Sequence, residues 1–272
     1  MSRPDLAPAS TKLLTQAVTG TPSHSWPAGP VSLWKALPFD GRRTLFERAL
    51  GSLWLAFQPI VSTSRTSSDV SLFAYEVLAR NAEPEVAAPT DLLALAVSVG
   101  MISELGRVVH RRAADALRAN AGLRLFVNVD VEELMGPLSE GDDTLEEFAD
   151  RVVLEVTERA PISELPEVRE RAGAMRDKGY RFAIDDLGGG YAGLSSLALM
   201  DPEFVKIDQA LIRHIDTEPV KNKIVGSLVA LTRQLGIGCI VEGVETEQER
   251  DALHALGCDL MQGYLFGRPG AI

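Results

Sequence analysis

Polar side chains recur in this chain at the ends of short apolar runs. Nine of them stand out by type and position: Glu76, Asn128, Glu155, Asp185, Asp186, Lys206, Asp208, Glu242 and Gln262. Most are carboxylates, and five or more carboxylates that meet in one place do not all stay ionised without bound cations. If the fold gathers these residues, they predict a metal site.

The apolar runs that carry these residues are strand-like. There are eight, at 53–59, 72–78, 123–129, 152–156, 180–186, 204–208, 239–243 and 258–263. Most connections are long enough for a helix, and a repeated βα unit predicts an α/β fold of the TIM-like (β/α)8 barrel type, in which the C-terminal ends of the strands converge. The polar connection 61–70 is too short for a crossover helix. The first two strands should therefore form a hairpin, which gives one antiparallel strand near the N-terminus.

The donor atoms favour hard cations over zinc. Carboxylate and amide oxygens suit Mg²⁺ and Mn²⁺, whereas the histidines show no zinc-ligand spacing; they are His24, His110, His214 and His254. A single acid at a strand end is ordinarily a rim residue or a helix cap. The Asp185–Asp186 pair, followed by three glycines, fits that explanation less well, although alternation points only one neighbour inward unless the strand ends there. Lys206 would be costly to bury unpaired in its apolar run, which favours a functional role.

The composition is that of a globular protein with an acidic surface. The 272 residues are 46% hydrophobic and 24% charged, with a formal net charge of −11. The charge argues against binding to long nucleic acid or to an anionic membrane, and an anionic substrate would need metals and local cations. No apolar run approaches membrane-spanning length, and no signal-peptide pattern precedes the domain. Cys239 and Cys258 suggest free thiols in a reducing compartment, so we expect a soluble, cytoplasmic protein.

Residues 1–40 differ from the rest of the chain. They hold six prolines among Ser, Thr and Gly, so we expect a flexible tail; the alternative is an ordered arm in which Trp26 and Trp34 dock on the barrel. Residues 41–272 should form one barrel domain. Its expected helices include 41–53, a stretch 91–118 broken around Gly100, and 219–236. The expected caps are Thr90, Pro166 (as a first helical residue), Gly179 and a capping box of Thr246 with Glu249.

Short motifs in a fixed order resemble a known family. They read YEVLAR (75–80), FVNV (126–129), VLEVTE (153–158), AIDDLGGGYAGL (183–194), VKID (205–208), VEGVET (241–246) and QGYLFGRP (262–269). Each motif is weak alone. Together, over about residues 45–270, they closely resemble the EAL-domain family of phosphodiesterases, which act on the bacterial second messenger cyclic di-GMP.

The resemblance implies a role for each matching residue. The metal ligands would be Glu76, Asn128, Glu155, Asp185, Asp186, Asp208 and Glu242. Lys206 would orient the attacking water, with Glu242 either a ligand or the base that accepts its proton, and Gln262 would position water or substrate. Glu158 would pin the loop after the fifth strand, and Glu245 would organise the loop before the last helix. Substrate contacts would come from Arg80, Gln58 and Asp208.

The implied reaction is the hydrolysis of one phosphodiester of cyclic di-GMP to linear 5′-pGpG, with two Mg²⁺ or Mn²⁺ ions per site. Calcium is expected to inhibit, and the family often works as a homodimer. No regulatory partner can be named from the residues. The alternative is a weak or inactive EAL domain that acts as a cyclic di-GMP receptor and signals through a protein partner. Such receptors usually lack a metal-site acid or the lysine, and none is missing here.

Two regions depart from the family pattern. In the loop after the fifth strand, Leu187, Gly189, Ala192 and Gly193 replace the usual Phe, Thr or Ala, and two serines. The extra glycine raises the entropy cost of ordering this loop, so turnover or its regulation should differ. Asn81 replaces a tryptophan that often follows the arginine, which is expected to weaken ligand contacts.

Overall fold

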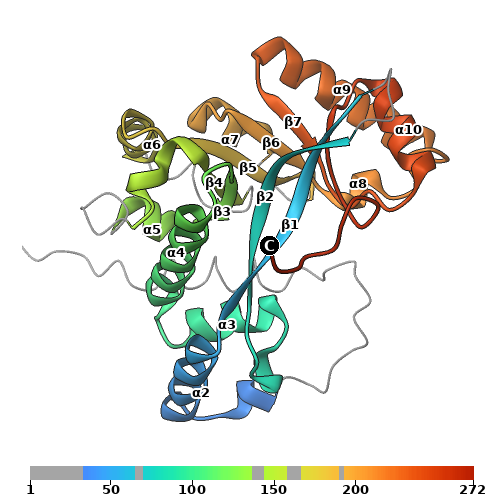
Figure 1. Cartoon of the computed structure of the whole chain (residues 1–272). Helices are drawn as coiled ribbons and strands as arrows, with labels where there is room; N and C mark the ends of the chain where they lie inside the picture. Colours follow the sequence, from blue (N-terminus) through green and yellow to red (C-terminus); the bar gives the residue numbers. More distant parts are fainter. Residues whose placement is uncertain (1–32, 65–69, 137–143, 158–166, 190–192) are drawn as a thin grey trace, which may run out of the picture. The chain divides into compact units, whose positions relative to one another are not determined.

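The computed structural model describes residues 33–64, 70–136, 144–157, 167–189 and 193–272 (Figure 1). The chain divides into two compact units. The smaller contains the residues up to Leu55 together with Ala79–Val109, and the larger contains Ala56–Leu78 and His110–Ile272. Strands β1 and β2 contribute residues to both. In the described ranges no helix is long and apolar enough to cross a membrane.

Eight strands close into a barrel in sequence order. They are β1 (Trp54–Thr63), β2 (Val70–Arg80), β3 (Leu125–Asn128), β4 (Val152–Thr157), β5 (Arg181–Leu187), β6 (Phe204–Ile207), β7 (Gly238–Val241) and β8 (Leu260–Gln262). Strands β2 to β8 pair in parallel, whereas β1 pairs antiparallel with β8. The predicted barrel with one antiparallel strand near the N-terminus is therefore confirmed.

A layer of apolar side chains fills the barrel interior, one from each of seven strands. These residues are Ile60, Ala74, Phe126, Val153, Ala183, Phe204 and Ile240, and Leu260 of β8 packs against them. Side chains along a strand alternate between its two faces, so the residue two positions further on also points inward. In the parallel strands that residue lies one layer closer to the C-terminal mouth. This register decides which polar residues meet.

Helices alternate with the strands and cover the outside of the barrel (Figure 1). In the larger unit they are α5 (Val131–Met135), η4 (Glu146–Arg151), α6 (Glu167–Asp177), α7 (Gly193–Met200), α8 (Gln209–Ile212), α9 (Pro219–Leu235) and α10 (Glu247–Leu256), and α4 (Ile102–Ala119) has residues in both units. Outward-facing strand residues such as Val241 and Met261 pack with Val229 of α9 and Leu253 of α10. Gly179 and Gly236 have positive φ angles after α6 and α9, as expected of C-terminal caps, and the capping box of Thr246 and Glu249 is present; Pro166 lies outside the described residues.

The smaller unit has its own apolar core, made by η1 (Leu33–Ala36), α2 (Phe39–Gly51), η2 (Pro84–Val86) and α3 (Pro89–Ser98). Trp34 is buried in this core and its indole N–H donates to Asp91 at 3.3 Å. The expected break between α3 and α4 is confirmed at Gly100, with φ of 67°. The expectation that Thr90 caps this helix is wrong. The helix begins at Pro89, and Ala88 is its N-cap. Residues 33–40 form η1 and the start of α2, and the rest of the expected tail, Trp26 included, lies outside the described residues.

Candidate metal centre

The strand register brings seven of the predicted site residues into one interior layer. Each lies two positions beyond a residue of the apolar layer: Glu76, Asn128, Glu155, Asp185, Lys206, Glu242 and Gln262 follow Ala74, Phe126, Val153, Ala183, Phe204, Ile240 and Leu260. In antiparallel β1, Ile60 lies opposite Gln262, and Gln58 lies two positions further along the same face of the strand. The period of two along a strand therefore explains why these residues meet at the C-terminal mouth.

Lys206 lies at the centre of this layer. Its Nζ is 2.7 Å from Glu242, 2.9 Å from Glu155, 3.1 Å from Asp185 and 3.3 Å from Glu76, and its side chain is fully buried. Desolvation alone would lower the pKa of Lys206, but the four carboxylates together raise it, so the ammonium stays charged. The predicted cost of burying this lysine is thus offset by four ion pairs.

Two amides hold carboxylates of the cluster. Gln262 Nε2 donates to Glu76 Oε2 at 2.6 Å, and Asn128 Nδ2 donates to Glu155 Oε2 at 3.3 Å. Gln262 Oε1 is buried and accepts no hydrogen bond from any residue that the structure describes. A buried acceptor of this kind normally has a partner, so Gln262 Oε1 is available to a water molecule or a ligand.

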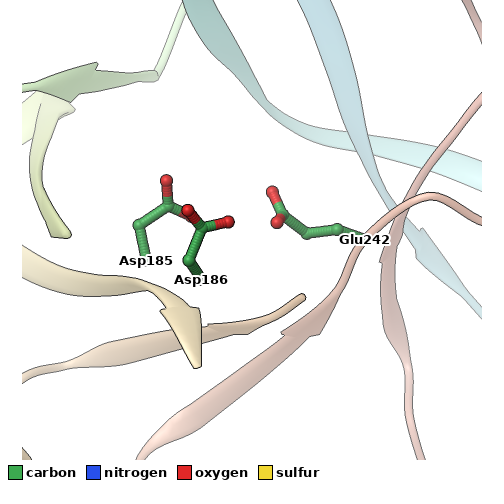
Figure 2. Close-up of side chains that lie close together, drawn as sticks. All are labelled: Asp185, Asp186 and Glu242. Carbon is green, nitrogen blue, oxygen red and sulfur yellow. The ribbon is translucent and has the colours of Figure 1, made fainter. Parts of the chain in front are cut away.

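Asp185 and Asp186 both contribute to the cluster although they are neighbours in β5. The register of β5 against β6 shifts between Ile184 and Leu187, and Asp186 has a φ of 59°. This irregular backbone overrides the alternation that would turn one of the two side chains outward. Asp185, Asp186 and Glu242 offer carboxylate oxygens that lie within 4.8 Å of one another, and Figure 2 shows the Asp pair facing Glu242.

The cluster contains more negative charge than Lys206 can balance. Burial raises the pKa of Glu155 and of Glu242 well above the usual range, against the attraction of Lys206. Burial, Asp185 and Asp208 raise the pKa of Asp186 to about 7. Such groups ionise fully only when further positive charge arrives, and oxygen donors at this spacing suit hard divalent cations. The residues present therefore fit a centre for Mg²⁺ or Mn²⁺.

Asp208 lies at the edge of the cluster. Its Oδ1 accepts the backbone N–H of Ala210 at 2.6 Å and so caps α8, while the same carboxylate lies close enough to Asp186 to raise the pKa of that residue. A side chain at Gly189 would place its Cβ 3.1 Å from the Asp208 carboxylate. Glycine at position 189, one of the departures from the family pattern, therefore leaves room for Asp208 beside Asp186.

The remaining predicted residues lie in three different settings. Gln58 in β1 donates from Nε2 to Gly267 O at 3.3 Å. Arg80 belongs to the smaller unit, where its Nη1 donates to Ala79 O, and its role stays a prediction. Glu158 lies outside the described residues. Asn81, which replaces the family tryptophan, is buried and closes the turn at η2 by accepting from Glu83 N–H and donating to Val86 O.

The sequence predicted that Glu245 organises the loop after β7, but it did not predict the distant partners that hold this loop. Arg213 forms an ion pair with Glu245, and Glu249 accepts hydrogen bonds from the backbone of His214, Glu245 and Thr246. The capping box predicted the bond to Thr246, but no local pattern predicts the bond to His214. Gly263 approaches the backbone of Val244 so closely that a Cβ would lie 2.0 Å from its carbonyl oxygen. These contacts fix the loop that follows Glu242.

The sequence matches the EAL domain family over residues 42–269. The chain belongs to the EAL domain family. Among curated relatives, the probable cyclic di-GMP phosphodiesterase PdeG of Escherichia coli K12 is 29% identical over 225 residues, which is 78% of this chain and 44% of the relative. The cyclic di-GMP phosphodiesterase PdeL of the same organism is 29% identical over 230 residues, 78% of this chain and 62% of the relative. This EAL chain thus spans about half the length of the curated relatives it matches.

Solved EAL structures have the same fold. The PaMucR phosphodiesterase in complex with c-di-GMP superposes with a TM-score of 0.73 at 27% identity, covering 84% of this chain and 97% of that one. BlrP1 of Klebsiella pneumoniae, in a manganese and c-di-GMP complex, gives a TM-score of 0.70 at 32% identity over 80% of this chain and 56% of that one. The predicted family and fold are confirmed.

Proposed function

We propose that this EAL domain is a cyclic di-GMP phosphodiesterase that hydrolyses its substrate to linear 5′-pGpG with the help of divalent metal ions. The observation that carries the proposal is the complete set of carboxylates around Lys206 at the mouth of the barrel. The relatives named as cyclic di-GMP phosphodiesterases and the manganese complex of BlrP1 support it.

Two Mg²⁺ or Mn²⁺ ions would be held by Glu76, Asn128, Glu155, Asp185, Asp186, Asp208 and Glu242. Bound in this way, they would lower the pKa of a water molecule and neutralise charge on the phosphate. Asp186 would help to hold both ions, because burial and the nearby Asp185 and Asp208 raise its pKa and so leave negative charge for cations to balance. Calcium prefers longer, more flexible coordination, which is the reason we expect it to inhibit.

The protein residues would then divide the chemistry. The water oxygen would attack phosphorus, the bond from phosphorus to the 3′ oxygen would break in line, and the 3′ oxygen would take up a proton from solvent to leave as a hydroxyl. The phosphate would therefore stay on the 5′ oxygen of the linear product. Glu242, 2.7 Å from Lys206, either accepts the proton of the water or acts only as a ligand. Lys206 orients the water and offsets charge that develops on the phosphate oxygens. Gln262 positions water or substrate through its unused carbonyl oxygen.

Several further assignments belong to the same proposal. Gln58, Arg80 and Asp208 would contact the substrate, and Glu158 would hold the loop after β5.

We also propose a cytoplasmic homodimer. Helix α9 supports this proposal because it exposes Val220 and Ile224, whose side chains are 68% and 42% accessible. Light scattering on the purified chain tests the dimer, and an Ile224→Asp variant that is no more monomeric than the wild type would count against α9.

The deciding experiment is direct. Purified protein is incubated with cyclic di-GMP and Mg²⁺ or Mn²⁺, with EDTA in a parallel sample, and the nucleotides are separated by chromatography. We expect linear 5′-pGpG only in the metal-containing sample. Binding of cyclic di-GMP without any linear product would overturn the proposal and favour the receptor that signals through a partner.

A further inference from the structure

The chain has two cysteines, and the fold brings them together. Cys239 lies in β7, and Cys258 lies in the connection from α10 to β8. Strands β7 and β8 are neighbours, with Ile240 opposite Leu260. Cys258 belongs to the apolar layer between the barrel wall and helices α9 and α10, and Cys239 packs against the same layer. Neither takes part in the proposed metal centre.

The two thiols have different environments. Cys239 is partly exposed, whereas Cys258 is buried. A hydrogen bond from Cys258, with a further one that involves Thr232, lowers the pKa of Cys239. The same bond and burial raise the pKa of Cys258. Because the thiolate is the reactive form of cysteine, Cys239 is the thiol of the pair that a small oxidant would attack first.

We propose that Cys239 and Cys258 form a reversible intramolecular disulfide when the protein meets a peroxide. In the first step the Cys239 thiolate attacks one peroxide oxygen, the O–O bond breaks, and hydroxide leaves with sulfenic acid on Cys239. In the second step the Cys258 sulfur attacks that sulfenic sulfur, its proton goes to the departing hydroxyl, and water leaves as the S–S bond forms. The peroxide is reduced, and the two thiols are oxidised. A small thiol reductant reverses the reaction by thiol–disulfide exchange.

The disulfide would join two segments that carry site residues. Cys239 precedes Glu242 by three positions along β7, and Cys258 precedes Gln262 by four positions along β8. The bond would therefore close a loop around α10 on the outside of the wall, with no change in the interior layer. Its formation does not depend on the proposed hydrolysis, so each can be tested without the other.

The test uses the full chain, reduced and then freed of reductant. After treatment with hydrogen peroxide, the protein is alkylated under denaturing conditions and analysed by mass spectrometry with non-reducing digestion. We expect alkylatable thiols to fall from two per chain to nearly none, a mass loss of two hydrogens, and a linked peptide pair containing Cys239 and Cys258; dithiothreitol should restore both thiols.

Single variants identify the order of the steps. Cys258→Ser should stop at a sulfenic acid on Cys239 that dimedone traps, whereas Cys239→Ser should react far more slowly. Circular dichroism first checks that both variants are folded. If either is unfolded, the wild-type measurement alone tests the disulfide. Two thiols that persist in treated wild type, or oxidation only to sulfinic acid or to disulfides between chains, would overturn the proposal.

Discussion

Lys206 Nζ lies within 3.3 Å of four carboxylates, so the lysine and the acids stabilise one another's buried charges. Removing one member of such a group leaves charges without a partner, which costs about 3–5 kcal/mol for a buried pair. The lysine thus contributes to the stability of the metal-free protein as well as to the proposed chemistry. The two contributions can be separated, because bound cations can replace the charge of Lys206 in stabilising the carboxylates but cannot replace Lys206 in the proposed chemistry.

We predict that Lys206→Met lowers the unfolding temperature most when EDTA is present and less when Mn²⁺ is present, and that the hydrolysis seen with Mn²⁺ is lost. Thermal unfolding under the two conditions measures this difference. The matched control is Lys178→Met, which breaks the surface pair with Glu146 and should change stability by at most about 1 kcal/mol. An equal loss of stability with and without Mn²⁺ would contradict the explanation.

Glu76→Ala tests a proposed ligand rather than the central cation. The change removes the carboxylate that Gln262 holds at 2.6 Å, and we expect turnover to be lost and the affinity for Mn²⁺ to fall by at least about tenfold. Calorimetry with Mn²⁺ alone reports the affinity independently of the activity. Asp115→Ala, on an exposed helical surface, is the control and should leave both unchanged. Unaltered turnover in Glu76→Ala would show that the ligand assignment is wrong.

At the scale of elements, the sequence alone predicted most of the site because a strand has a fixed period. Once Glu76 and Glu155 are placed on parallel strands of one barrel, alternation and register bring their side chains to the same layer. Asp186 was not predictable in this way. Its inward position depends on a register shift and a left-handed φ of 59°, which arise from the fit of β5 to β6 and leave no local signature.

Helix α10 illustrates what a local pattern shows and what it omits. The capping box marks the first turn, but Glu249 also binds the distant His214 N–H at 3.0 Å. Burial alone would raise the pKa of Glu249, but the hydrogen bonds that its carboxylate accepts from backbone N–H groups lower this pKa. Glu249 therefore connects the segment before α9 to the loop that follows Glu242.

We predict that Glu249→Ala destabilises the protein by about 1–3 kcal/mol at neutral pH, because it leaves buried backbone donors unsatisfied. A lowered folded pKa means that the stabilisation is complete above the ordinary carboxyl pKa of 4.5 and is lost as pH falls through the folded value. The difference in unfolding free energy between wild type and Glu249→Ala should therefore become smaller in acid, as urea unfolding at several pH values will show. Glu249→Gln is the control, because its side chain keeps a hydrogen-bond acceptor but cannot titrate. A gap that stays constant in acid would rule out the carboxylate as its source.

At the scale of the whole molecule, residues 41–272 were predicted to form one barrel domain, which stays a prediction, and their described part belongs to two compact units. The reason lies in α2 and α3, whose apolar faces pack with Trp34 and Val86 into a separate core. Composition and helix periodicity predict that such faces are buried, but they do not say against which partner. The division of one apolar set into two cores becomes visible only in three dimensions.

This division leads to a prediction about metal binding in the whole chain. A ligand that binds only the folded state stabilises it by mass action, by about 2.7 kcal/mol at a hundredfold excess over its dissociation constant. The proposed ligands for which the structure gives contacts, from Glu76 to Glu242, lie in the larger unit, and that unit carries the unbalanced charge. Mn²⁺ should therefore slow amide hydrogen exchange in β4 to β7. The core of α2 and α3 should exchange at the same rate with and without the ion.

Hydrogen exchange followed by mass spectrometry resolves the two units in a single experiment. Glu155→Gln is the matched variant, because it keeps the size of a fully buried side chain but removes its charge. It should abolish most of the Mn²⁺ effect on β4 to β7 and leave α2 and α3 unchanged. Protection that rises equally in both units would mean that the ion acts on the acidic chain as a whole, through its net charge of −11, and not at the carboxylates around Lys206.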